Sequence, residues 1–168
     1  MPLDHAKKFT FRFKDKKIVF NQSTSEREFH VFAKALTFAL YHKIYPTIRV
    51  EAKSDERYQP DLSAIGYDGE MLFWAECGNV SMDKIEKLFK KYRQAHFVFV
   101  KEEKDVPVFQ KHLDRMAKDM ISLPLVDIVV YPEHFQDWYV SEEGDVFVPR
   151  EDVTVLRWHE PKERVKYY

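Results

Sequence analysis

The stretch Gln59-Pro60-Asp61-Leu62-Ser63-Ala64-Ile65-Gly66-Tyr67-Asp68-Gly69-Glu70-Met71-Leu72-Phe73-Trp74-Ala75-Glu76-Cys77-Gly78 decides the fold. Two apolar runs flank Asp68-Gly69, a dipeptide typical of two-residue hairpin loops. With a loop of two or four residues, Asp61 faces Glu76, whereas a three-residue loop sends the two carboxylates to different faces. Neighbouring carboxylates need a cation, a shared proton or a basic side chain between them. A loop of two or four residues therefore predicts a charged site at the end of the hairpin where Asp61 and Glu76 lie.

Both faces of this hairpin are expected to be covered. The residues of the two strands alternate between the faces of the sheet. One face is expected to carry Leu62, Ala64, Met71, Phe73, Ala75 and Cys77, and the other Ile65, Leu72 and Trp74 beside the two acids. Such a pattern predicts a sheet between two helical layers.

The flanking segments show helical and strand periodicity. The alternation of Phe9, Phe11 and Phe13 predicts an N-terminal hairpin. Apolar residues at helical spacing predict three helices, one after a Ser25–Glu28 capping box, one after Ser81 and one that contains Pro107. Strands are expected at 47–53, 95–100 and 125–131, and a C-terminal β meander at 138–140, 146–148 and 153–156.

The composition is that of a globular protein. The chain has 168 residues, 45% hydrophobic and 33% charged, which fits one domain over 1–168 with a core at about 23–101 and a frayed tail at 160–168. No apolar run approaches the roughly 18 residues of a membrane span. The N-terminus has no apolar signal core, and the single Cys77 cannot form an internal disulfide, so a cytoplasmic location is expected.

Charge is unevenly distributed along the chain. The net charge of −1 argues mildly against a dedicated nucleic-acid-binding protein. Two segments are nevertheless basic, and a local basic surface is compatible with the neutral total. The basic residues are Lys7, Lys8, Arg12, Lys14, Lys16 and Lys17 near the start, and Lys84, Lys87, Lys90, Lys91 and Arg93 later on.

The expected central order is helix, strand, strand, strand, helix, strand, with Pro60-Asp61 on the second strand and Glu76 on the third. This order and these acids resemble the PD-(D/E)XK nuclease superfamily, and more closely the YaeQ family within it. The resemblance runs to about Arg157 and is carried by Thr37-Phe38-Ala39-Leu40, Gln59-Pro60-Asp61-Leu62, Trp74-Ala75-Glu76-Cys77-Gly78 and the Lys-rich helix beginning near Asp83-Lys84. It implies a restriction-endonuclease-like α/β fold with an αβββαβ core, a mixed central sheet between helices. For YaeQ-like proteins it implies no settled substrate.

The resemblance also implies a site. Asp61 and Glu76 would hold Mg²⁺ or Mn²⁺ with the backbone carbonyl of Cys77, and a water on the cation would attack phosphorus. Glu28 or Glu26 could add a carboxylate, although Glu28 also fits a capping role. The Cys77 side chain falls on the apolar face and is expected in the core. The expected activity is metal-dependent hydrolysis of a nucleic acid, either DNA or RNA.

The superfamily's lysine would follow Glu76 at two residues' distance, where this chain has Gly78. Two lysines of the next helix could replace it. Helical geometry favours Lys84, about 90° from the centre of the apolar stripe, and the YaeQ-like pattern favours Lys87. If neither lysine reaches the acids, an inactive binding or regulatory module is the better hypothesis.

If the acids share one site, Asp61→Asn should leave the fold intact and raise stability without metal, because like charges repel. The sequence leaves the oligomeric state open.

Overall fold

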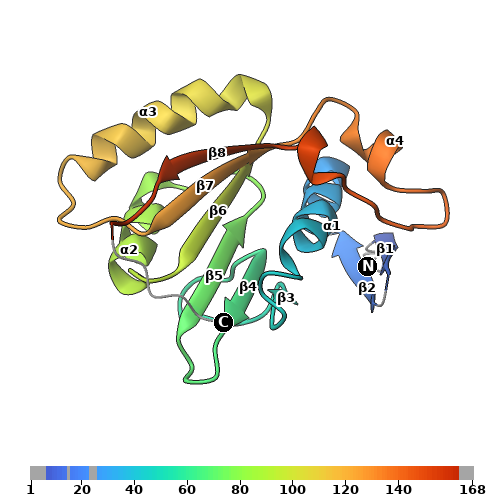
Figure 1. The fold of residues 1–168 in the computed structure, drawn as a ribbon, viewed down its shortest axis with the longest axis horizontal. Helices are drawn as coiled ribbons and strands as arrows, with labels where there is room; N and C mark the ends of the chain where they lie inside the picture. Colours follow the sequence, from blue (N-terminus) through green and yellow to red (C-terminus); the bar gives the residue numbers. More distant parts are fainter. Residues whose placement is uncertain (1–6, 15, 23–25, 163–168) are drawn as a thin grey trace, which may run out of the picture.

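The computed structural model describes residues 7–14, 16–22 and 26–162, and its main element is a six-stranded mixed sheet (Figure 1). The strand order is β3-β4-β5-β6-β7-β8. These strands span Arg49–Val50, Leu62–Ile65, Met71–Glu76, His96–Lys101, Leu125–Val130 and Thr154–His159. β5, β6 and β7 are parallel, and the outer pairs are antiparallel. The carboxyl ends of the three parallel strands therefore share one edge of the sheet, where ligands of open α/β sheets commonly bind.

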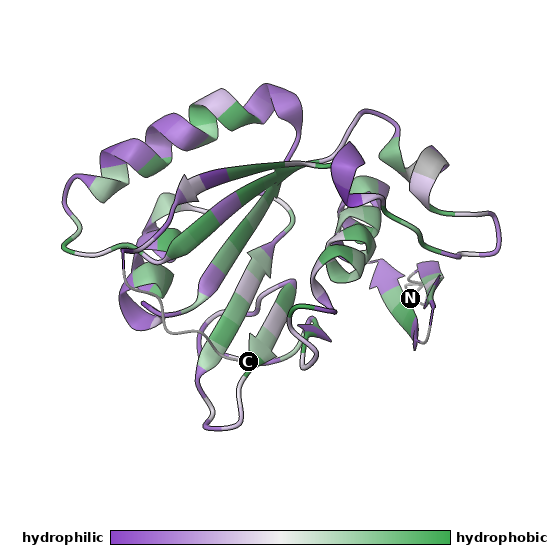
Figure 2. Ribbon diagram, in the orientation of Figure 1, coloured by the Kyte–Doolittle hydropathy of each residue, from purple (hydrophilic) through white to green (hydrophobic). Residues whose placement is uncertain are grey.

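Helices cover both faces of the sheet, as the hairpin pattern predicted (Figure 1). On one face, α2 (Met82–Lys91) and α3 (Val106–Ala117) pack on a cluster that includes Trp74, Phe97 and Leu113. On the other face, α1 (Glu28–Tyr41) packs on a cluster that includes Phe73 and Val98. Figure 2 shows the hydrophobic strands at the centre and hydrophilic residues along the outer side of α3.

The predicted N-terminal hairpin is confirmed as a separate two-stranded sheet, β1 (Lys7–Phe13) and β2 (Lys16–Gln22). Its aromatic face packs on α1, with the Phe11 ring centroid 5.3 Å from that of Phe32 and Phe13 4.8 Å from Phe38. α1 therefore lies between the hairpin and the main sheet.

The helix starts agree in part with the sequence patterns. The capping prediction for the first helix used Ser25, which lies outside the described residues, and α1 starts at Glu28 with Arg27 as N-cap and no side-chain cap. In α2, the Ser81 hydroxyl accepts a hydrogen bond from the Lys84 amide at 3.2 Å, as predicted. None of the described helices has the length and apolar character needed to cross a membrane.

The expected strand at 47–53 is reduced to the two residues of β3. Glu51 has a φ of 49°, in the left-handed region that side chains rarely adopt, and this geometry ends the strand. The conformation also brings the Glu51 side chain to Lys34 of α1.

The predicted C-terminal meander is wrong in its first two strands. Residues 138–140 were expected in a strand, but α4 spans Phe135–Tyr139, and the strand expected at 146–148 is reduced to an isolated antiparallel bridge between Val140 and Val146. Phe135 and Tyr139 are one helical turn apart and both are buried, which favours a helix over an extended segment. Only the last strand, β8, joins the sheet, antiparallel to β7. Two short 3₁₀ helices span Glu103–Asp105 and Arg150–Asp152. Of the predicted frayed tail, residues 163–168 lie outside the described residues.

Candidate functional site

The β4–β5 hairpin positions the two acids, but its loop differs from the two-residue prediction. Gly69 has a φ of 80° and donates its amide to the Gly66 carbonyl at 3.0 Å, and the Gly66 amide donates to the Glu70 carbonyl at 2.9 Å. The loop therefore has three residues, Tyr67 to Gly69, a common hairpin form with glycine in the left-handed region.

A bulge next to the loop restores the predicted register. Ile65 pairs with Met71, whereas Ala64 pairs with Phe73, so Leu72 is the extra residue. Beyond the bulge, Ser63 pairs with Trp74 as predicted. Between the bulge and the loop the prediction is wrong, because Met71 joins Trp74 in the α2-side cluster and Leu72 packs on the α1-side cluster.

Asp61 lies just beyond the last pair of this ladder, Leu62–Ala75, and its side chain closes the end of the hairpin. The Cys77 amide donates to Asp61 Oδ2 at 2.7 Å. His30 Nε2, on the first turn of α1, lies 3.1 Å from the same oxygen. Burial alone would raise the pKa of Asp61, but the His30 hydrogen bond and charge, together with the Cys77 amide, lower it below its ordinary value.

His30 belongs to a chain of charged groups along α1. Its Nδ1 lies 2.7 Å from Glu26 Oε1, and Lys34 Nζ lies 2.6 Å from the same oxygen. Lys34 is buried and also forms an ion pair with Glu51. Burial opposes the charge on His30, but Asp61 outweighs it, so the pKa of His30 lies above its ordinary value of 6.5.

Glu76 ends β5 and has a different set of partners. Its Oε1 accepts a hydrogen bond from the Trp74 indole at 3.0 Å and lies 2.7 Å from Lys84 Nζ. Burial, followed by repulsion from Asp61, nevertheless raises the pKa of Glu76 above its ordinary value despite these donors. Asp61 and Glu76 line the same pocket.

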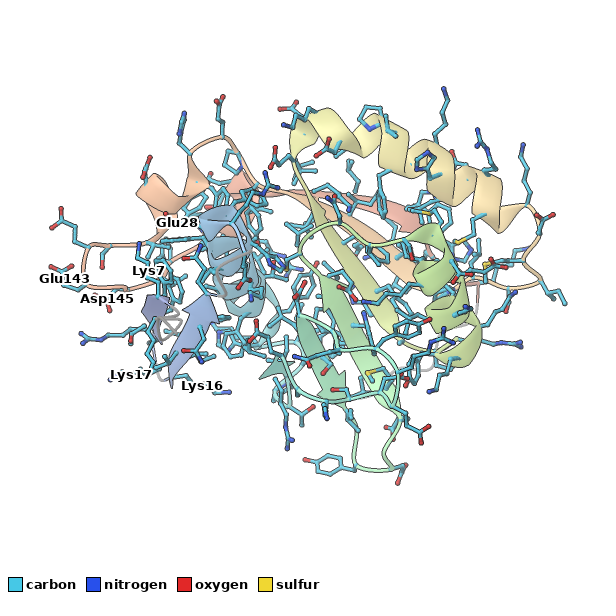
Figure 3. All side chains as sticks on the ribbon, turned by 180° about the vertical axis from the view of Figure 1, so that it is seen from behind. Lys7, Lys16, Lys17, Glu28, Glu143 and Asp145 are labelled. Atoms are coloured by element: carbon cyan, nitrogen blue, oxygen red, sulfur yellow. The ribbon has the colours of Figure 1, made fainter. Side chains whose placement is uncertain are left out.

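The other predicted residues divide between the site and the surface. Lys84 reaches Glu76, whereas Lys87 is exposed and its Nζ lies 2.8 Å from Asp83 Oδ2. Glu26 faces the site, whereas Glu28 is exposed at the start of α1 (Figure 3). The Cys77 side chain is buried in the core as predicted, and burial raises the pKa of its thiol.

Two further cationic side chains surround position 78. A Cβ added to Gly78 would lie 3.6 Å from His30 Nε2, so a side chain at this position would point toward His30. Lys101, at the end of β6, donates from Nζ to the Gly78 carbonyl at 2.8 Å, and burial lowers its pKa. His30 and Lys101 thus provide nitrogen groups beside the position where the expected lysine is absent.

The sequence analysis missed His30, Lys34 and Lys101. For α1 a signal existed, because Glu26, His30 and Lys34 are spaced by four residues and so project from one side of the helix. Lys101 follows a buried strand and carried no comparable signal.

A pocket of about 250 Å³ lies at this site and is lined by Glu26, Arg27, Phe29, His30, Asp61, Glu76, Cys77, Gly78 and Asn79. Lys34, Lys84 and Lys101 contact groups of the site without being part of this lining. Among the described residues, no set of three or more His, Cys, Asp or Glu side chains is arranged to enclose a metal ion. A cation in this pocket would therefore depend on Asp61, Glu76, main-chain oxygen and water.

A larger pocket of about 610 Å³ shares Phe29 with the first. Its charged residues are mainly acidic, with Glu102, Glu103 and Glu133 beside Lys104. The smaller pocket has a similar balance of charge, with Glu26, Asp61 and Glu76 beside Arg27 and His30, so it is singled out by the two predicted acids and not by its charge.

The fold is similar to that of solved protein structures. The YaeQ protein from Xanthomonas axonopodis pv. citri is 16% identical, with a TM-score of 0.59 and coverage of 92% of each chain. The YaeQ protein from Pseudomonas syringae is also 16% identical, with a TM-score of 0.64 and coverage of 90% of this chain and 89% of that one. The chain has the YaeQ fold. No family model and no curated protein matches the sequence.

The shared YaeQ fold agrees with the resemblance seen in the sequence. At this level of identity it establishes the arrangement of helices and strands, and the roles of Asp61 and Glu76 are argued from their own surroundings.

Proposed function

We propose that the pocket around Asp61 and Glu76 is the active site of a Mg²⁺- or Mn²⁺-dependent phosphodiester hydrolase acting on a nucleic acid. The observation that carries the proposal is that the partly buried Asp61 and the buried Glu76 line one pocket, with His30 beside Asp61 and Lys84 beside Glu76. Perturbed acids in a pocket are typical of functional sites. The resemblance of the sequence motif to PD-(D/E)XK nucleases supplies the reaction class.

The donor set fits a hydrated hard cation. Among the described residues, the side-chain contacts of Asp61 all involve Oδ2 and those of Glu76 all involve Oε1, which leaves one oxygen of each carboxylate for a ligand. Mg²⁺ keeps several waters and commonly binds through one or two carboxylates, so a complete protein cage is not required. When bound, the cation would supply an activated water and stabilise developing negative charge.

The chain's own cationic groups would position the phosphate. Lys84 is the best candidate to replace the lysine missing at Gly78, because its Nζ lies 2.7 Å from Glu76 Oε1. Its side chain is 21% exposed, so a ligand can reach it. His30, held between Asp61 and Glu26, would add positive charge on the other side of the pocket. Fixed positive charge near a phosphoryl group stabilises the transition state without reorganisation at the moment of reaction.

A second candidate function has an observation in its favour. The ion pairs Lys84–Glu76 and His30–Asp61 already compensate both acids without a metal. A site compensated in this way suits a binding or regulatory module that has kept a nuclease fold.

Hydrolysis of labelled DNA and RNA substrates with Mg²⁺, Mn²⁺ or EDTA distinguishes the two candidates. A hydrolase should require the metal and lose activity on Glu76→Gln and Asp61→Asn, and Lys84→Met should lower the rate about 10²-fold. Lys87→Met is the matched control and should retain activity, because Lys87 pairs with Asp83 away from the pocket. A wild type without metal-dependent hydrolysis of any substrate would favour the binding module.

A further inference from the structure

The two basic segments of the sequence differ in how their charge is compensated. On α2, every lysine has a carboxylate partner: Lys84–Glu76 at 2.7 Å, Lys87–Asp83 at 2.8 Å, Lys90–Glu86 at 2.8 Å and Lys91–Asp55 at 2.6 Å. The N-terminal hairpin is different. Within the part of the chain that the structure describes, no ion pair joins Lys7, Lys8, Arg12, Lys14, Lys16 or Lys17 to a carboxylate. We call these six residues the basic ribbon.

All six side chains of the basic ribbon are exposed. The apolar side chains Phe9, Phe11 and Phe13 face α1, so the alternate positions Lys8 and Arg12 lie on the outer face. Lys17 of β2 pairs directly with Arg12. Like charges opposed across two strands destabilise a hairpin, and this cost is offset when an anion binds between them.

The remaining cations lie at the two ends of the hairpin. Lys7 lies at one end and Lys16 at the other (Figure 3). Lys7 Nζ is 4.7 Å from the Phe9 ring centroid, and Lys16 Nζ is 5.9 Å from the Phe38 ring centroid. Lys8 and Arg12 are four residues apart on β1, about 13 Å at the rise of a strand. On the outer face, the positive charge therefore extends along the hairpin from Lys8 to the Arg12–Lys17 pair instead of gathering at one point, as a linear polyanion requires.

The hairpin also leads toward the proposed active site. The Gln22 side chain, at the end of β2, donates to the Glu26 carbonyl at 2.6 Å, and Glu26 lines the pocket with Asp61. Lys7 pairs with Gln22, so the start of β1 lies at the pocket end of the hairpin. The Lys7–Gln22 end of the hairpin is therefore the end nearer to Glu26 and the pocket.

An acidic segment limits the basic ribbon on one side. The Arg12 amide donates to the Gly144 carbonyl at 2.7 Å, and the Val146 amide donates to the Arg12 carbonyl at 2.8 Å. This backbone pairing holds Glu143 and Asp145 beside the β1 edge (Figure 3). Gly144 is required for the approach, because a Cβ there would lie 2.2 Å from the Thr10 carbonyl oxygen. A polyanion would be repelled from this edge.

We propose that the basic ribbon binds the phosphodiester backbone of a nucleic acid and guides it toward the Asp61–Glu76 pocket. This inference rests on the proposed function, because it takes the bound nucleic acid to be the substrate of the Asp61–Glu76 pocket. A membrane surface fits less well, because binding at a membrane interface needs a broad apolar face. Among the described residues of the hairpin, Val19 is the only large apolar side chain that is exposed.

The test is binding of a labelled DNA duplex and a labelled RNA duplex by fluorescence anisotropy, in EDTA so that metal-dependent hydrolysis does not contribute. The variant is Lys8→Gln/Arg12→Gln/Lys17→Gln. The control, Lys87→Gln/Lys90→Gln/Lys111→Gln, removes the same number of exposed charges elsewhere. We expect the ribbon variant to bind at least tenfold more weakly, with a salt dependence shallower by about 0.9 per lost phosphate contact on duplex DNA, while the control binds like the wild type. Glu143→Gln/Asp145→Asn should tighten binding, because both changes remove an acid beside the β1 edge.

Three results would overturn the proposal: equal weakening by the ribbon variant and the control, wild-type binding without salt dependence, and wild-type binding to anionic phospholipid vesicles but to neither duplex. If the triple variant does not fold, Lys17→Gln alone should still reduce the DNA salt slope by about 0.9. Since the assay needs no hydrolysis, failure of the proposed activity and failure of this surface are separate outcomes.

Discussion

His30 Nε2 of α1 lies 3.1 Å from Asp61 Oδ2, at the end of the β4–β5 hairpin, and this contact connects the first helix to the central sheet. Asp61 raises the pKa of His30 above its ordinary value against the effect of burial, and His30 is in turn the main group that lowers the pKa of Asp61. The pair should therefore contribute to stability over a defined range of pH.

We predict a pH-dependent loss of stability in His30→Gln. The contribution of His30 is complete below about pH 6.5 and is lost as the pH rises through its raised folded pKa. The contribution of Asp61 is present above about pH 4 and is lost as the pH falls through its lowered folded pKa. Thermal unfolding should show a loss of about 1 kcal/mol near pH 5.5 and a smaller loss near pH 9. The exposed His112→Gln is the control, and a loss independent of pH would contradict the prediction.

The two acids should respond oppositely to neutralisation. The sequence alone predicted higher stability for Asp61→Asn, but Asp61 has a lowered pKa and its charge is stabilised, so this change should cost about 1 kcal/mol at pH 7 in EDTA. Glu76 has a raised pKa, so its charge opposes folding above that pKa, and Glu76→Gln should be neutral or stabilising at pH 7. Melting temperatures of both variants measure the difference. The opposite order would show that Glu76 is the acid with the stabilised charge.

Lys34 should be the most important single charge for stability. It is 1% exposed and pairs with Glu26 and Glu51, so Lys34→Met leaves carboxylates without their buried partner. We expect a loss of about 3 kcal/mol or more in urea unfolding. Lys87→Met removes an exposed pair and should change stability by less than about 1 kcal/mol. A Lys34→Met protein as stable as the wild type would contradict the assigned network.

The sequence predicted the central hairpin because Asp68-Gly69 and the alternating apolar residues are local signals. It did not predict the three-residue loop or the bulge at Leu72, since several loop lengths are compatible with the same dipeptide. The Ser63–Trp74 pairing was still correct, because the bulge compensates for the change in loop length. The two departures cancel at the end of the hairpin where the acids lie.

Other features depend on contacts between distant segments. The lysines of α2 form ion pairs, and one partner, Asp55, lies far from α2 in the sequence. The sequence therefore could not show that the charges of α2 are paired with carboxylates while those of the basic ribbon are not. The helix at 135–139 is favoured by the packing of Phe135 against Phe29, a contact between segments far apart in the sequence. Lys101 reaches Gly78 only because β5 and β6 are parallel neighbours.

Calorimetric titration with Mn²⁺ tests the central claim most directly, because it requires no knowledge of the substrate. The proposed site predicts one bound Mn²⁺ per chain, lost in Glu76→Gln and Asp61→Asn and retained in Asp83→Asn, which changes an exposed acid of α2. Affinity should fall as the pH is lowered through the raised pKa of Glu76, because a protonated carboxyl competes with the cation. Equal binding by the wild type and Glu76→Gln, or no binding by the wild type, would contradict a metal site at Asp61 and Glu76.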